Sequence, residues 1–258
     1  MTLRVNAAKG EVDLRFKNQR LLTYAFAADQ FKPYVKSLYT LQGADVLQDS
    51  PPDHLHHHGL MYAIRVNGVN FWEERDAPGH ERSVKILSPE TGRNAAGLPQ
   101  AAFTQLIHWV THTNAALADT APVALLIERR TITVTVDEAK QEVALDWRGE
   151  FEVGATKVTL TGSDYNGLGL RLPPSFDHVA RHENSENTPY TGKGQRGVTP
   201  AKWSRVSHTV DGRKLVVTLL DRPGNAGGQA RFFTMLDPFA YLAVTQGLDK
   251  APIEYPAG

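Results

Sequence analysis

Apolar and polar residues alternate with a period of two along most of the chain. Residues 131–136 read TITVTV, so threonines take one face of an extended segment and aliphatic residues take the other, as in a half-buried strand. The polar residues 137–140 interrupt this pattern and residues 143–147, VALDW, resume it, which predicts a hairpin. The same alternation recurs in further segments, namely VDLRF, LLTYAF, SVKIL, FTQLIHWVTH, TKVTL, KLVVTLL and RFFTML.

Helical signals are weak by comparison. No apolar pattern at positions i, i+3 and i+4 persists for three turns. Residues 89–100 and 173–202 are rich in turn-forming and charged residues and are predicted to be loops, of which the longer one has the length of a binding loop. The chain is therefore predicted to be all-β, with a single domain over residues 1–258.

Composition narrows the range of partners. The 28 basic and 28 acidic residues give a net charge of zero, which provides no basic surface for nucleic acid or an anionic membrane. Cysteine is absent, which excludes disulfides and thiolate chemistry. We therefore expect a small-molecule partner, with no nucleic acid and no membrane, and the oligomeric state stays open.

The N-terminal segment bears on localisation. It reads MTLRVNAAKGEVDLRF and lacks the apolar core of a signal peptide, and no segment approaches the roughly 18 apolar residues of a membrane span. A cytoplasmic protein is expected, and a signal peptide removed before maturation is left open.

Residues 53–59, DHLHHHG, place four imidazoles and a carboxylate within seven residues. Histidine titrates nearest neutrality and is also the commonest metal ligand. The cluster lies inside the chain and is interrupted by Leu55, which argues against a purification tag. Chance neighbours on a surface loop remain an alternative to a functional site.

A metal ion is a second use for these imidazoles. In an extended segment His54, His56 and His58 would project to one side, opposite Leu55 and His57, and could share one ion. No Cys or H-E-x-x-H helix accompanies them, so a further ligand would come from a carboxylate or from a distant histidine, His108, His112, His178 or His182. The cofactor is therefore unknown, with a divalent metal as one possibility.

Residues 164–171, DYNGLGLR, form a second constellation. The pair Asn166-Gly167 favours a type I′ turn, so it predicts a hairpin that joins TKVTLTG to GLGLRLP. Arg171 ends the second segment just before Pro173-Pro174. It would either clamp a hydroxyl or carboxylate of a ligand or pair with Asp164.

Charged residues also fall on an apolar strand face. Glu128 and Arg130 share their side of the segment with Leu126 and Ile132, which indicates either an ion pair, the commoner outcome, or a polar cleft. Glu128 is a reserve candidate for a catalytic base.

Several motifs together resemble a known family. They are SPPDHLHHHGLMYAIRVNGVNFW, ERRTITV, GLGLRLP, TPAKWSRV, LLDRPGNAGG and RFFTMLDPFAYL, and they span roughly residues 20 to 255. Their order resembles an uncharacterised bacterial family of the DUF6807 type, labelled methane-oxygenase-like. A membrane oxygenase subunit needs spanning helices, which this sequence lacks. The resemblance instead implies similarity to the galactose-mutarotase-like supersandwich, a large antiparallel two-sheet β-sandwich found in enzymes acting on sugars.

These inferences lead to a carbohydrate-active enzyme that uses histidine for general acid–base catalysis, as an epimerase, lyase or hydrolase. The expected catalytic residues are His57, His58, His56 and Asp164. The expected substrate-binding residues are Asp53, His54, Arg171, Trp203 and Asn225. The alternatives are a metal-dependent enzyme that uses His54, His56 or His58, and a sugar-binding module without catalysis.

Overall fold

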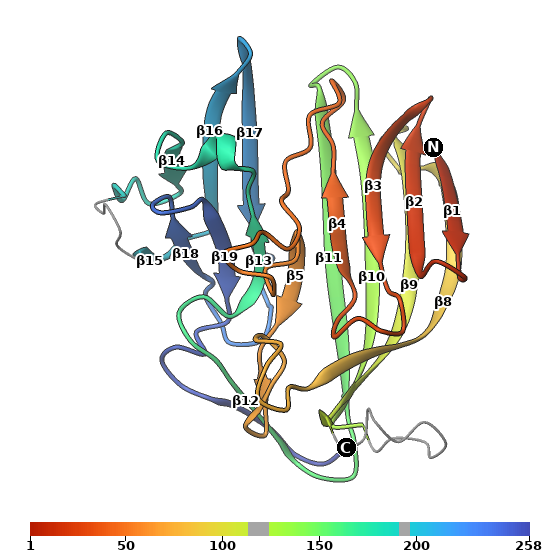
Figure 1. Ribbon diagram of the computed structural model, residues 1–258, viewed down its shortest axis with the longest axis vertical. Helices are drawn as coiled ribbons and strands as arrows, with labels where there is room; N and C mark the ends of the chain where they lie inside the picture. The colour runs from red at the N-terminus through yellow and green to blue at the C-terminus, as the bar shows by residue number, and fades with distance from the viewer. Residues whose placement is uncertain (113–123, 191–196) are drawn as a thin grey trace. The chain divides into compact units, whose positions relative to one another are not determined.

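The computed structural model describes residues 1–112, 124–190 and 197–258, and nearly all of its regular structure is β-strand (Figure 1). The helical element bounded within these residues is one turn of 3₁₀-helix, η1, at Pro174–Phe176. The all-β prediction is confirmed.

The described chain divides into two compact units. Unit 1 comprises Met1–Asp45, Val66–Thr159 and Glu254–Gly258, and unit 2 comprises Val46–Arg65 and Leu160–Ile253. The chain passes between the units four times. The first passage lies between Asp45 and Val46, and the other three lie within short strands, β6 (Arg65–Val66), β12 (Val158–Thr161) and β20 (Ile253–Tyr255). The expectation of a single domain stays a prediction.

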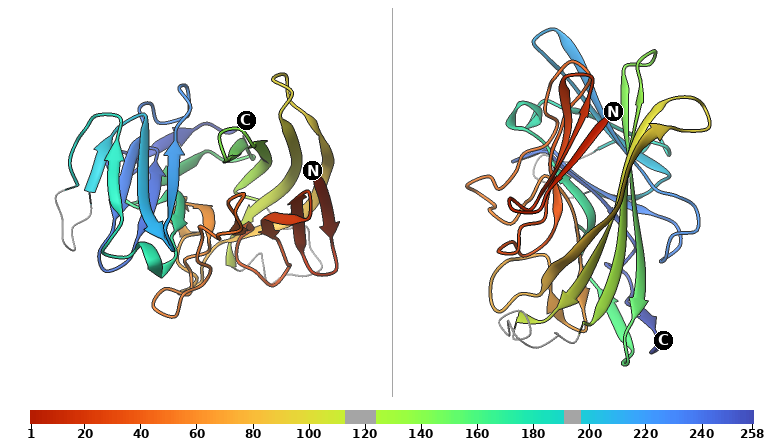
Figure 2. Two further views of the ribbon diagram at one scale, coloured as in Figure 1. Left: turned by 90° about the horizontal axis from the view of Figure 1, so that it is seen from above. Right: turned by 90° about the vertical axis from the view of Figure 1, so that its right-hand side faces the viewer.

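Unit 1 has two antiparallel layers, which Figure 2 shows as the red strands and the yellow-to-green strands. The short strand β7 (Val69–Asn70) also lies in this unit. The first layer contains four consecutive neighbours, β1 (Thr2–Asn6), β2 (Glu11–Phe16), β3 (Gln19–Ala25) and β4 (Tyr34–Leu38). The second contains another four, β8 (His80–Arg93), β9 (Pro99–Val110), β10 (Leu126–Asp137) and β11 (Glu142–Val153).

The period-two pattern decides which side chains lie between these layers. Every second residue of β10 from Leu126 to Val136 is buried, so one face of the strand points into the core. Across the core, the rings of Tyr24 in β3 and Phe103 in β9 meet edge to face with centroids 5.1 Å apart. The hairpin predicted around residues 137–140 is confirmed as the β10–β11 connection.

The loop predicted over residues 89–100 is largely wrong. Strands β8 and β9 run on as a hairpin through most of it, and only residues 94–98 form the connection. The side chain of Asn94 holds this turn, since its Oδ1 accepts hydrogen bonds from the backbone N–H groups of Ala96 and Leu98. The polar residues 89–93 therefore belong to an exposed hairpin end, where a strand needs no apolar face.

The core of unit 1 contains a buried charge network. Arg130 donates from Nη2 to Glu128 Oε2 at 2.7 Å and to Glu81 Oε2 at 2.9 Å, and all three side chains are fully buried. Arg130 also donates to the hydroxyl of Tyr24 and packs on the Trp147 ring. Glu128 therefore belongs to a structural ion pair, and the polar-cleft alternative is wrong.

Unit 2 also consists of two antiparallel layers. The hydroxyls of Ser204 and Thr234, one from each layer, lie 3.4 Å apart in its interior. The larger layer has the order β5 (Leu60–Ala63), β13 (Gly167–Arg171), β19 (Tyr241–Thr245), β18 (Arg231–Met235) and β15 (Gly197–Pro200). The smaller layer has the order β14 (Arg181–Asn184), β16 (Trp203–Val210) and β17 (Arg213–Leu220).

Two predictions in unit 2 need correction. The stretch 173–202 is not one loop, because it contains η1, β14 and β15. The Asn166-Gly167 pair does not close a hairpin, since β13 pairs with β5 and β19 and not with β12. Close packing explains the glycines instead: Gly167 has φ +128°, and a Cβ there would lie 2.3 Å from the carbonyl oxygen of Val244.

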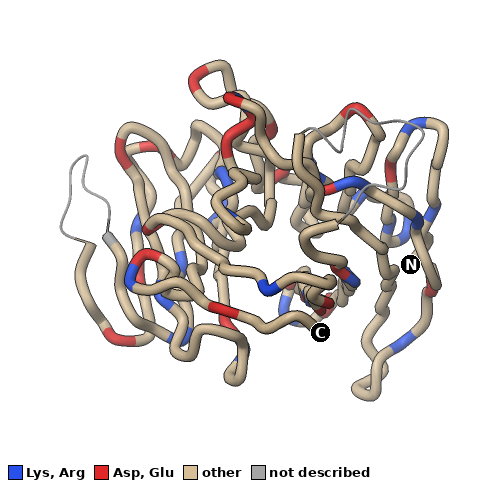
Figure 3. The backbone as a smooth tube through the Cα atoms, turned by 90° about the horizontal axis from the view of Figure 1, so that it is seen from below, with Lys and Arg blue, Asp and Glu red and all other residues tan. Residues whose placement is uncertain are grey.

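Charged residues of both signs are mixed along the chain. Figure 3 shows Lys and Arg interspersed with Asp and Glu along the backbone, in keeping with the net charge of zero. In the described ranges, no helix is long and apolar enough to cross a membrane.

Candidate functional site

The histidine-rich segment of unit 2 folds as two successive turns. The backbone N–H of His54 donates to Pro51 O and that of His57 donates to His54 O, both at 2.9 Å. Pro51, Pro52 and Asp53 favour turns because proline fixes φ and aspartate bonds nearby backbone. The segment is therefore not extended, and the alternation of histidines between two sides does not apply.

These turns bring three imidazoles together. His54 and His57 stack with ring centroids 4.4 Å apart and planes 19° apart. His56 meets the His57 ring edge-on at 4.7 Å, and its centroid is 5.7 Å from that of His54. We call His54, His56 and His57 the imidazole cluster.

Asp53 and Arg171 hold this cluster from the end of β13. Oδ2 of Asp53 accepts hydrogen bonds from His54 Nδ1 at 2.9 Å and from Arg171 Nη2 at 3.1 Å. Arg171 is only 4% exposed, and its guanidinium lies over the Phe239 ring at 3.7 Å from the centroid. The alternative in which Arg171 pairs with Asp164 is wrong.

The backbone of Arg171 is fixed as firmly as its side chain. Its N–H donates to Gly59 O at 2.9 Å, and its carbonyl accepts from Gln48 N at 3.0 Å. The segment from Gln48 to Gly59, which contains the cluster, is thus hydrogen-bonded at both ends to the last residue of β13. This arrangement positions Asp53 opposite the guanidinium without relying on the side chains alone.

Burial and nearby positive charge determine the protonation state of His57. His57 is 7% exposed, and burial, together with the neighbouring His56, His54 and Arg171, lowers its pKa from 6.5 to about 2. Arg171 Nη1 lies 3.4 Å from His57 Nδ1, and because a guanidinium only donates, Nδ1 must be the accepting nitrogen. His57 therefore stays neutral at ordinary pH.

In contrast to His57, Asp53 has its charged form favoured by its surroundings. Burial by itself raises the pKa of this carboxyl, but hydrogen bonds from His54 and Arg171 and the Arg171 charge outweigh it, so the pKa of Asp53 is lowered. The side chain of Asp53 is 46% exposed. An ionised, accessible carboxylate therefore lies beside His54.

His58 pairs with a second carboxylate, that of Asp49. Its Nδ1 lies 3.0 Å from Asp49 Oδ1 and 3.0 Å from Ser50 Oγ, and its side chain is 13% exposed. Both partners approach the same ring nitrogen. The trio therefore lacks the arrangement of a Ser-His-Asp triad, in which serine and carboxylate bind different nitrogens.

Three other predicted site residues lie away from the cluster. Asp164 precedes β13 at the end opposite Arg171, and the strand alone separates these ends by about 13 Å. Trp203 is half-buried under the Arg205 guanidinium, and the exposed Asn225 donates to Asp221. None of the three has a hydrogen bond, ion pair or ring contact with the cluster. Their roles stay predictions.

The more distant histidines do not join the cluster either. His178 pairs with Asp237, and His182 bonds Ser204 and Thr234. In the parts of the chain that the structure describes, no group of three or more His, Cys, Asp or Glu residues has the geometry to hold a metal ion. The imidazole cluster thus stacks its rings instead of converging its nitrogens.

Sequence reasoning missed two aromatic neighbours of the cluster and one carboxyl near Arg171. The ring centroid of Phe239 lies 4.8 Å from that of His54, and the ring centroid of Tyr241 lies 5.3 Å from that of His57. Asp177, a half-buried carboxyl whose pKa burial raises, interacts electrostatically with Arg171 and Asp53. A Cβ at Gly169 would lie 1.8 Å from the Tyr241 hydroxyl, so the second glycine of GLGLR makes room for this ring, but the sequence does not show which ring fills that space.

Comparison with known proteins assigns a family. The chain belongs to DUF6807, a family of unknown function, which matches residues 11–258. No curated protein and no solved structure matches the chain. The resemblance to the DUF6807 type is confirmed, while the methane-oxygenase-like label and the likeness to the mutarotase fold stay predictions.

Proposed function

We propose that this member of an unassigned family is an enzyme that acts on a sugar or a modified glycoside by general acid–base catalysis at the imidazole cluster. One observation carries the proposal. Partly exposed His54 has its Nδ1 fixed by Asp53, which is itself clamped by buried Arg171. A base held in one orientation by a supported carboxylate is a recurring catalytic arrangement.

The geometry favours His54 as the group that moves the proton. When Nδ1–H donates to Asp53, the lone pair lies on Nε2, which makes no hydrogen bond within the described chain. The adjacent carboxylate balances the charge that develops as the imidazole takes up a proton. His57 is better suited to positioning, because burial keeps it neutral.

The surroundings favour a hydroxylated substrate. Both side-chain hydrogen bonds to the Asp53 carboxylate end on Oδ2, so Oδ1 is able to accept one from a substrate hydroxyl. Phe239 and the flat imidazoles add apolar ring faces beside these polar groups. A few convergent polar groups next to aromatic faces are typical of small-molecule sites.

A panel of sugars in D₂O tests the proposal. Aldoses, uronates and methyl glycosides would be incubated with enzyme purified without a tag and followed by proton NMR for exchange, isomerisation, elimination or hydrolysis. We expect one class to change with the native protein and not with His54→Gln. A panel that stays unchanged overturns the enzyme proposal in favour of a binding module, and activity abolished by EDTA overturns it in favour of the metal-dependent alternative.

A further inference from the structure

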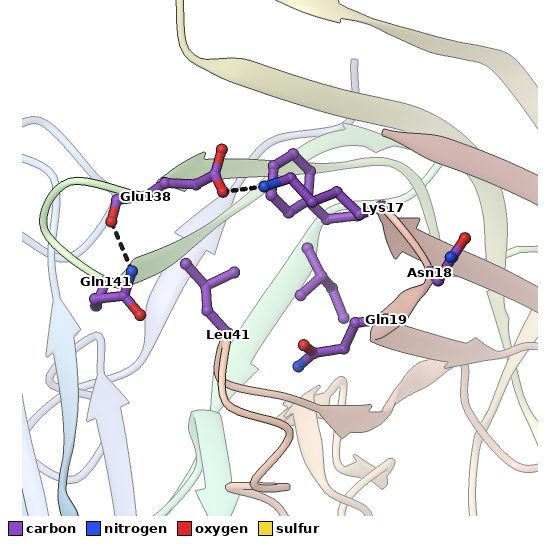
Figure 4. Close-up of a pocket in the computed structure, with 8 residues that line it drawn as sticks. Lys17, Asn18, Gln19, Leu41, Glu138 and Gln141 are labelled. Carbon is purple, nitrogen blue, oxygen red and sulfur yellow. Dashed lines mark hydrogen bonds and ion pairs between the residues drawn. The ribbon is translucent and has the colours of Figure 1, made fainter.

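Unit 1 has a pocket of its own, formed where three chain connections meet (Figure 4). The β2–β3 turn contributes Lys17 and Asn18, the segment after β4 contributes Leu41, and the β10–β11 turn contributes Glu138 and Gln141. The cavity volume is about 450 Å³, within the range of small-molecule sites. It contains none of the residues of the imidazole cluster.

The lining combines an apolar floor with a polar rim. Leu21 is fully buried, and Phe16 and Leu41 are half-buried beside it. Exposed polar side chains from the turns surround this floor, as Figure 4 shows for Lys17 and Glu138. Such a surface suits a ligand with one apolar face and several hydrogen-bonding groups.

Hydrogen bonds between the connections hold the rim in place. Lys17 Nζ donates to Glu138 Oε1 at 2.5 Å, which links two turns that are far apart in sequence. Gln141 Nε2 donates to the carbonyl of Glu138 at 2.7 Å, and Gln42 Nε2 donates to Gln141 Oε1 at 2.5 Å. The turn that contains Glu138 is therefore ordered before any ligand arrives, which lowers the entropic cost of binding.

Several polar side-chain groups on the rim are available to hydrogen-bond a ligand. Gln19 uses its Nε2 on Thr40 O, which leaves its Oε1 without a partner within the described chain. The side-chain amide of Asn18 and Oε2 of Glu138 are likewise unengaged there. These groups offer both donors and acceptors, which hydroxyl groups are able to match.

From this geometry we infer that the pocket binds a neutral polyhydroxylated ligand the size of one or two sugar rings. The adjacent ammonium of Lys17 and carboxylate of Glu138 neutralise each other, so the rim attracts neither an anion nor a cation. The partly accessible side chains of Phe16 and Leu41 would contact the less polar face of the ring, with buried Leu21 packed behind them. The inference is independent of the catalytic proposal, because the pocket contains none of the residues of the imidazole cluster.

Titration calorimetry with methyl β-D-galactopyranoside and maltose as probes tests this site, with D-galacturonate as the charged comparison. We expect the neutral probes to bind and the uronate to bind more weakly. Leu41→Trp, which fills the cavity, should abolish binding. Ala95→Trp, which adds the same ring at the exposed β8–β9 turn, should not.

Two further variants keep the test decisive if Leu41→Trp lowers the melting temperature. Asn18→Ala removes an amide that makes no bond in the described protein and should weaken binding about three- to tenfold. Glu138→Gln should reduce the preference for the neutral probes over the uronate. Absence of binding, or binding that is unchanged in Leu41→Trp, overturns the inference. So does binding that is lost in His54→Gln, because that result places the ligand at the imidazole cluster.

Discussion

Nη2 of Arg171 donates a hydrogen bond to Oδ2 of Asp53 at 3.1 Å, although the two residues are 118 positions apart in the sequence. The contact links the end of β13 to the turns that contain the imidazole cluster. Since the same Asp53 oxygen accepts from His54, a change at Arg171 should reach the histidine through the carboxylate.

Arg171→Lys tests this relationship. A lysine lacks the planar fork that reaches Asp53 and His57 together while stacking on Phe239. We expect the free energy of unfolding to fall by about 1–3 kcal/mol and the pKa of Asp53 to rise, as followed by carboxyl NMR. Arg148→Lys, at an exposed site, is the matched control and should change stability by no more than about 0.5 kcal/mol. An unchanged Asp53 titration in Arg171→Lys would show that the guanidinium does not control this carboxyl.

His57 should make the protein sensitive to acid. Its pKa is lowered from 6.5 to about 2 by burial, so the unfolded chain takes up a proton below pH 6.5 that the folded state does not. The stabilising contribution is complete above pH 6.5 and is lost as the pH falls toward the folded pKa, at up to about 1.4 kcal/mol per pH unit. Urea unfolding between pH 4 and 7 should show a shallower pH dependence in His57→Gln than in the native protein. Equal slopes, or a His57 ring signal that titrates near pH 6, would contradict this.

Glu81 in unit 1 should make the protein less stable as the pH rises, which is the opposite of the effect of His57. Burial raises its pKa from 4.5 to about 8, with Arg130 opposing and Glu128 reinforcing the shift. The folded state keeps a proton that the unfolded chain releases, so this contribution is complete below pH 4.5 and is lost as the pH rises through about 8. We expect Glu81→Gln, which resembles the protonated acid, to lose less stability between pH 6 and 9. Glu150→Gln, at an exposed position, should follow the native curve, and a Glu81→Gln curve parallel to it would refute the assignment.

Much of the fold was predictable because it depends on local pattern. The alternation of TITVTV corresponds to the alternating burial of β10, and polar residues 137–140 do form the turn after it. Loop composition was a poorer guide, since residues 89–93 are polar and still belong to β8. A polar sequence predicts exposure, and an exposed hairpin end is as polar as a loop.

The candidate site was only partly predictable. A cluster of imidazoles is visible in one short segment, but the partners of each ring depend on long-range pairing. Tyr241 reaches His57 because β19 pairs with β13 opposite Arg171, and no local pattern reveals that register. The turns after Pro51 likewise place Nδ1 of His58 beside Asp49, which an extended segment would not have suggested.

Asp53→Asn addresses the carboxylate that orients His54. The amide keeps the size of the side chain but removes the charge that supports the imidazole, so turnover on a substrate from the sugar panel should fall about 10- to 100-fold. Binding of the substrate should change much less. If turnover is unchanged, Asp53 does not position the base.

The most direct test of the account is the turnover of His54→Gln on the same substrate. Glutamine retains a hydrogen-bonding group but does not titrate, so we expect a loss of about 10²- to 10⁴-fold with an unchanged melting temperature. His178→Gln is the matched control, because His178 also binds an aspartate through Nδ1, at 3.0 Å, and it should retain native turnover. Native turnover in His54→Gln would contradict the proposal that this imidazole moves the proton.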